Sequence, residues 1–134
     1  MGLEIKNLND AIQVTKDEGT KVAYYLFDEY EIHLNTILPG TKQAWHYHQA
    51  IEEIILVTKG KMEVHYLQNG QQLQQIVKVN DLVLVKDSIH TFVNSGAQEC
   101  QFIVFRLVLE GKNKREIFKH DKTEVPEGVI VNKE

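Results

Sequence analysis

The chain has 134 residues, a formal net charge of −4 at pH 7, 43% hydrophobic residues and 25% charged residues. This is the length of one domain and the composition of a folded globular protein, which excludes an intrinsically disordered chain. The acidic balance argues against a nucleic-acid partner, because a nucleic-acid surface usually needs a basic stripe.

Cysteine usage and the N-terminal residues bear on the compartment. Cys100 is the only cysteine, so the chain can form neither an intramolecular disulfide nor a multi-cysteine zinc site. The first ten residues include Glu4, Lys6 and Asp10, where a signal peptide needs an apolar core. The longest apolar run, 22–27, is too short to cross a membrane. We therefore expect a cytoplasmic protein with no membrane partner.

The first predicted element is a short helix over 9–16, where Asn9 or Asp10 can cap one or two turns. After this segment the sequence predicts β-strands, because short segments rich in Val, Ile, Thr, Tyr and Phe alternate with turn signals. The strongest turn is Asn69-Gly70, since both residues accept a positive φ and suit a type I′ hairpin. The predicted strands cover residues 21–27, 30–38, 42–48, 53–59, 61–67, 72–78, 81–86, 89–94 and 101–109.

Nine short strands with brief connections predict an all-β sandwich or barrel with its core at about 21–109. The tail, 110–134, is weakly patterned, although Val125 and the run 129–131 could form a last strand. We expect this tail to pack on the body or on a partner subunit, so that residues 1–134 form a single domain.

Two histidines in one predicted strand point to a metal. His46 and His48 are two residues apart, so they project from the same face of the strand toward one volume. Glu53 has the opposite parity and reaches that volume only if the strand ends or bulges at 49–52. Imidazole and carboxylate together suit zinc, iron, manganese, nickel or cobalt.

A further ligand is expected from a distant segment. His90 begins a predicted strand, with Phe92 and Asn94 on its face. This strand could lie beside the first pair in a closed sheet. His33 alternates with Ile32 and Leu34 and belongs to no motif.

The segment 40–60 resembles the first motif of the cupin superfamily, which reads Gly, five residues, His-x-His, three or four residues, Glu, six residues, Gly. Every position of that motif is matched here, by Gly40, His46, His48, Glu53 and Gly60. The six-residue spacing to Gly60 favours Glu53 over its neighbour Glu52 as the ligand.

The second segment is similar to the second cupin motif, with His90 and Asn94 at its His-x-x-x-Asn end. It departs from the motif in two places. Asn80 replaces the usual opening Gly, and 86–88 replaces the usual Pro-x-Gly, one residue short of the usual spacing to His90.

This resemblance implies an antiparallel double-stranded β-helix, the jelly-roll barrel of a small single-domain cupin. It also implies one divalent transition metal (Zn, Fe, Mn, Ni or Co) held by His46, His48, Glu53 and His90. Four protein ligands leave two positions of a six-coordinate ion open. Small cupins of this kind are commonly homodimers that pair sheet edges, and exposed edges need such cover.

The function that follows is metal-dependent chemistry on a small oxygenated organic molecule, of dioxygenase, isomerase or decarboxylase type. Two alternatives stand beside it: a non-catalytic cupin that binds or senses a small molecule, and a metal-free sugar-nucleotide epimerase. Phe92, Asn94 and Arg106 are the expected pocket residues, and Arg106 could bind a carboxylate. An arginine or a second acid–base pair beside the metal would favour an enzyme, and an apolar pocket would favour a binding module.

Overall fold

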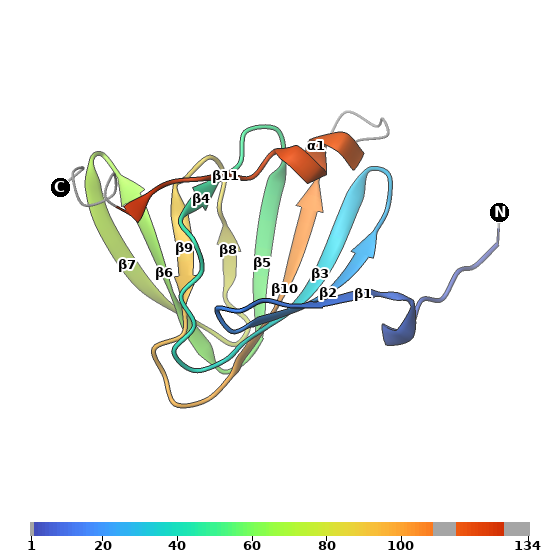
Figure 1. Ribbon diagram of the computed structural model, residues 1–134, viewed down its shortest axis with the longest axis horizontal. Helices are drawn as coiled ribbons and strands as arrows, with labels where there is room; N and C mark the ends of the chain where they lie inside the picture. The colour runs from blue at the N-terminus through green and yellow to red at the C-terminus, as the bar shows by residue number, and fades with distance from the viewer. Residues whose placement is uncertain (1, 109–114, 128–134) are drawn as a thin grey trace.

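The computed structural model describes residues 2–108 and 115–127, which form two antiparallel sheets (Figure 1). The six-stranded sheet has, in spatial order, β1 (Ile12–Thr15), β2 (Thr20–Leu26), β3 (Tyr30–Ile37), β10 (Cys100–Leu107), β5 (Glu52–Lys59) and β8 (Leu82–Leu84). The five-stranded sheet has β11 (Thr123–Glu124), β4 (His46–Tyr47), β9 (His90–Val93), β6 (Lys61–Gln68) and β7 (Gln71–Lys78). The helical elements are a 3-10 turn, η1 (Leu8–Asp10), and α1 (Arg115–His120). The prediction of an all-β jelly roll is confirmed.

The predicted N-terminal helix is wrong. Asn7 caps only the single turn η1, its side chain accepting from the Asn9 N–H at 2.9 Å while its own N–H donates to Asp10. The chain then becomes extended, and Ile12–Thr15 pairs with β2. Three of these four residues are β-branched, and the open edge of β2 supplies the hydrogen-bond partners that a strand needs.

The predicted strand 42–48 is also shorter than expected, because only His46–Tyr47 is regular. Residues before it follow β9 through separate contacts, the Gln43 N–H donating to the Phe92 carbonyl at 3.1 Å and Lys42 forming an isolated bridge with Val93. The segment therefore still runs beside β9, where the His46 strand was expected.

Alternation along the strands builds the core between the two sheets. The inward side chains of β5 and β10 include Ile55, Val57 and Phe102, all nearly or fully buried. Each such side chain contributes roughly 1.5–3 kcal/mol to stability. The remaining members of the main apolar cluster are Ile37, Met62, Val64, Val77, Val85, Phe92, Cys100 and Val104.

The same inward face becomes polar toward one end of the sandwich. On β3 the inward residues run from Ile37 through Asn35 and His33 to Glu31, and all four are buried. On β5 the inward face ends at Glu53, and on β10 it reaches Arg106. Buried charged groups need partners, so this end of the fold is the candidate location of a functional site.

None of the helices in the described residues has the length and apolar character to span a membrane.

Two glycines of the first motif differ in their surroundings and give a matched test of the fold. Gly60 has φ +74°, and a Cβ there would lie 2.6 Å from the Glu99 carbonyl oxygen, whereas Gly40 has φ +85° and open space around it. We expect Gly40→Ala to lower the free energy of unfolding by about 1–2 kcal/mol from the left-handed backbone alone. Gly60→Ala should cost about 1–3 kcal/mol more, because the neighbouring backbone must move. Urea denaturation measures both, and equal losses would contradict the close approach of Glu99 to Gly60.

Candidate metal centre

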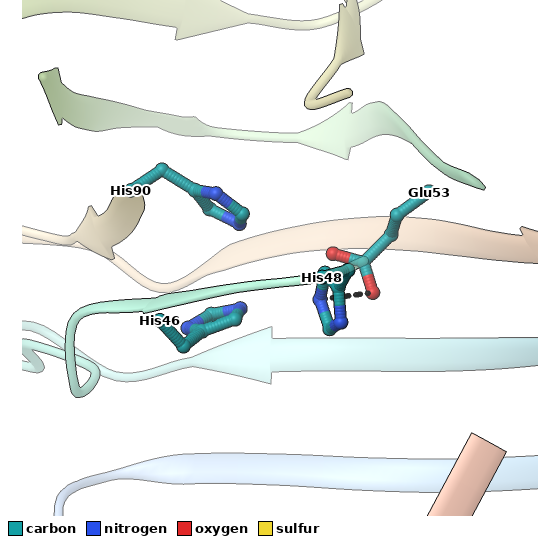
Figure 2. A group of neighbouring side chains, drawn as sticks. All are labelled: His46, His48, Glu53 and His90. Carbon is teal, nitrogen blue, oxygen red and sulfur yellow. Dashed lines mark ion pairs between the residues drawn. The ribbon is translucent and has the colours of Figure 1, made fainter. Parts of the chain in front are cut away.

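Four buried side chains converge at the polar end of the sandwich: His46, His48, Glu53 and His90 (Figure 2). One potential ligand atom from each lies within 4.8 Å of the others. His46 is on β4, His48 directly follows that strand, and Glu53 is on β5 of the opposite sheet. His90 opens β9 and is the direct cross-strand partner of His46. The structure thus brings the two motif segments together as the sequence predicted.

Two of the imidazoles are held in a single orientation by backbone carbonyls. His46 Nδ1 lies 2.9 Å from the Ala44 carbonyl oxygen, and His90 Nδ1 lies 3.0 Å from that of Ser88. Because a carbonyl only accepts, each Nδ1 carries the proton, and Nε2 keeps its lone pair. His90 Nε2 is buried and has no hydrogen-bond partner. A histidine fixed by a carbonyl at one nitrogen and open at the other is the usual form of a metal ligand.

His48 and Glu53 lie across the cluster from His90 (Figure 2). His48 Nε2 lies 3.4 Å from Glu53 Oε2, and both ring nitrogens of His48 are buried without a hydrogen bond. Leaving such groups unsatisfied costs about 1–3 kcal/mol each, and a bound cation would remove that cost. Three imidazoles and one carboxylate therefore fit a divalent transition metal.

The electrostatic surroundings favour the ligating forms. Burial, aided by neighbouring His90, lowers the pKa of His46 to about 3, and burial also lowers the pKa of His90. Burial alone would raise the pKa of Glu53, but the adjacent His48 and Arg106 outweigh it and lower that pKa to about 2. At neutral pH the carboxylate is ionised and these two imidazoles are neutral, as metal binding requires.

A cavity of about 370 Å³ opens on the cluster. His46, His48 and Glu53 line it, together with Phe92 and Arg106. A larger hollow of about 720 Å³ between β7 and β8 includes only His90 of the four and is mainly apolar, so we place the site in the smaller cavity.

Asn94 is engaged elsewhere. Its buried side-chain amide donates to the Ile37 and Gln98 carbonyls, each at 2.9 Å, and its Oδ1 accepts from the Gly96 N–H. Asn94 thereby fixes the turn after β9, and it makes no hydrogen bond to His90.

Glu31, His33 and Arg106 form a second polar cluster beside the first, and no sequence motif predicts it. His33 Nε2 lies 2.7 Å from Glu31 Oε1, and Arg106 Nη1 lies 3.2 Å from the same oxygen. Arg106 Nε in turn lies 3.2 Å from Glu53 Oε2. The register explains this chain of contacts, because Arg106 is the cross-strand partner of Glu31 on one side and of Glu53 on the other. The only sequence signal was the placement of Glu31 and His33 on one face of a strand.

Comparison with known proteins agrees with this fold. The model of the cupin domain matches residues 33–108, more than half of the chain. The chain belongs to the cupin family. No curated protein matches this cupin.

Solved structures share the fold of this cupin at low identity. A sugar phosphate isomerase of the cupin superfamily from Silicibacter pomeroyi has a TM-score of 0.67 at 17% identity, covering 78% of this chain and 75% of that one. An uncharacterised double-stranded β-helix protein from Klebsiella pneumoniae scores 0.65 at 17% identity, covering 81% and 93%. Drosophila melanogaster CENP-C, solved bound to CAL1, scores 0.66 at 18% identity, covering 76% and 84%. Such a range of proteins shows the fold and leaves the reaction to be argued from the site.

Buried neutral histidines predict an acid-labile fold. The pKa of His46 is about 3 in the folded protein against 6.5 as its ordinary value, so its contribution is complete above pH 6.5 and falls as pH drops below it. One such proton changes stability by about 1.4 kcal/mol per pH unit. The contribution of Glu53, whose pKa falls from 4.5 to about 2, is lost only below pH 4.5.

We therefore expect the metal-free protein to lose about 2 kcal/mol or more of unfolding free energy between pH 6.5 and pH 5. Urea titrations in the presence of a chelator measure this, and His46→Gln should flatten the slope. Stability that is level from pH 7 to pH 5 would contradict the protonation states assigned here.

Proposed function

We propose that this cupin binds one divalent transition metal through His46, His48, Glu53 and His90 and acts on a small oxygenated organic molecule at that metal. The observation that carries the proposal is the convergence of the four buried side chains, with His46 and His90 each fixed at Nδ1. The donor set is compatible with Zn, Fe, Mn, Ni and Co, so the order of metal affinities and the cellular supply decide the native ion more than ligand type does.

The cavity favours an enzyme over a passive binding module. It contains Arg106 and His33, and Glu31 bonds His33, so an acid–base pair and a guanidinium lie beside the cluster. The metal would act as a Lewis acid, and His33, which lines the cavity and is bonded to Glu31 through Nε2, would carry a proton to or from a bound molecule. Because Arg106 already contacts two carboxylates, we propose that it orients Glu31 and Glu53 and does not bind the substrate.

Two other functions have weaker support. A non-catalytic binding role is favoured by the likeness to CENP-C, a cupin solved in complex with another protein. A metal-free epimerase has to leave the His48 and His90 nitrogens buried and unsatisfied, which is costly. Absence of metal in the measurement below would favour one of these two functions over the metal-dependent enzyme.

The metal claim is tested by mass spectrometry of untagged protein purified without chelator. We expect one equivalent of transition metal per chain, and less than about a tenth of that in a His46→Ala/His48→Ala variant, which removes two of the four ligands. The control is His65→Ala, which breaks a His–Glu pair of similar geometry, 3.0 Å from Glu63, outside the cluster. Absence of metal from the wild type after refilling with each candidate ion would contradict the proposal.

We also propose that residues 1–134 form one cupin domain that assembles as a homodimer in the cytoplasm. Edge strand β1 presents Ile12 and Val14, which are 56% and 39% exposed, and an uncovered apolar edge favours pairing with a second copy. The single thiol, Cys100, is buried, and burial raises its pKa to about 11, so it stays protonated and unreactive at neutral pH.

Light scattering tests the dimer. We expect a mass about twice 15.5 kDa, and a shift toward 15.5 kDa in Ile12→Asp, because a charge would be buried at the paired edge. The control is Ile76→Asp, a similarly exposed isoleucine at 62% on β7, an edge strand of the five-stranded sheet. A wild-type mass near 15.5 kDa at all concentrations would refute the dimer.

A further inference from the structure

The carboxylate of Asp121 holds the loop that joins two of the clustered side chains. It accepts hydrogen bonds from three successive backbone N–H groups, those of Gln49, Ala50 and Ile51, at 3.0–3.2 Å. The Asp121 side chain is only 6% exposed. Three converging N–H groups form an anion-binding concavity, and here a side chain 70 or more residues distant in sequence fills it.

The loop 49–51 allows His48 and Glu53 to face the same volume. His48 and Glu53 have opposite parity and would face opposite sides of one continuous strand. In the structure the chain leaves β4 after Tyr47 and enters β5 at Glu52, so the intervening residues must turn their N–H groups away from any sheet. Asp121 receives three successive N–H groups of this connection, those of Gln49, Ala50 and Ile51. The convergence of His48 and Glu53 therefore depends on what fixes 49–51.

Asp121 also faces His48 directly. Its Oδ2 lies 3.8 Å from His48 Nδ1, on the side of the ring away from Glu53, whose Oε2 is 3.4 Å from Nε2. With Nε2 and Glu53 both directed to a metal ion, a carboxylate at this place would favour the proton on Nδ1, the tautomer that a ligand needs. Backbone carbonyls do the same for His46 and His90.

The segment that carries Asp121 is itself anchored at both ends. Phe118 packs with Ile51 and Val108 in a small buried cluster of its own. Beyond Asp121, the Val125 N–H donates to the Trp45 carbonyl at 2.9 Å, and Glu124 on β11 pairs with His46 on β4. Figure 1 shows this segment, from α1 to β11, crossing from the six-stranded sheet to the five-stranded sheet.

We propose that Asp121 is a positioning residue of the metal centre, which sets the loop 49–51 and the tautomer of His48 so that His48 and Glu53 reach one ion. This rests on the proposed function, since it presupposes that the cluster binds metal. It extends the centre beyond its four ligands to a residue on the C-terminal segment. The neutral amide of an asparagine cannot replace the carboxylate, because its NH₂ group would meet the loop N–H groups.

The test compares Asp121→Asn with the wild type, using Co²⁺ as the probe. We expect Co²⁺ affinity, measured by competition with a chromogenic chelator, to fall 10- to 100-fold. The visible absorption bands of bound Co²⁺ should change in position or intensity, since His48 and Glu53 no longer converge. Hydrogen exchange at the amides of 49–51 should also accelerate at least tenfold.

Asp81→Asn is the matched control. Asp81 also accepts a backbone N–H, that of Lys78 at 3.0 Å, but in an exposed turn that does not line the cavity around His46, His48 and Glu53. It makes the same chemical change and should leave Co²⁺ affinity and spectrum unchanged. Asp121→Glu restores the charge on a side chain one methylene longer, which displaces the loop. Its Co²⁺ affinity should lie between those of Asp121→Asn and the wild type, with a spectrum that still differs from wild type.

The outcomes separate the two proposals. Wild-type affinity and spectrum in a folded Asp121→Asn would overturn this inference alone and leave the metal proposal standing. Failure of the wild type to bind Co²⁺ would overturn both. If Asp121→Asn does not fold, Asp121→Glu decides: an altered Co²⁺ spectrum on a stable fold supports the inference, and a wild-type spectrum and affinity contradict it.

Discussion

The register of β10 between β3 and β5 is the constraint on which the cavity depends. It places Arg106 opposite Glu31 on one side and Glu53 on the other, so one guanidinium partners two buried carboxylates. A slip of one residue would turn every inward side chain of β10 to the outer face and leave both carboxylates buried without a cation. The apolar contacts of Phe102 and Val104 further along the same strand hold that register.

The register of β10 divides the interior into an apolar half and a polar half. One half is an apolar core. The other holds His33, His46 and Glu53, whose pKa values are lowered by burial in the histidines and by neighbouring charges in the carboxylate. Stability and function thus draw on the same strands, since β3, β5 and β10 each contribute side chains to both halves. The unsatisfied nitrogens of His48 and His90 are the cost of keeping the second half ready for a ligand.

Much of this arrangement could be predicted from the sequence, because local patterns encode it. Strand alternation and the Asn69-Gly70 turn predict the β-fold, and the spacing of His46 and His48 places both on one face of a strand. The convergence of Glu53 and His90 on that pair is implied by the resemblance to the cupin motifs, because strand parity alone turns Glu53 to the other face. The network of Glu31, His33 and Arg106 depends on which strands become neighbours, which no local pattern states. No local pattern predicts the role of Asp121 either, because its partners lie 70 or more residues away in the sequence. The sequence predicts a helix at the N-terminus because the local capping residues favour a helical turn, whereas the open edge of β2, a distant feature, makes residues 12–15 extended.

The central claim is that His46, His48, Glu53 and His90 hold one metal ion. X-ray absorption spectroscopy of the Co²⁺-loaded protein tests it most directly. The account predicts an N/O shell at about 2.0–2.2 Å, with outer-shell scattering that requires about three imidazoles per ion. A first shell of oxygen alone, without imidazole scattering, would show that the ion binds elsewhere and would contradict the account.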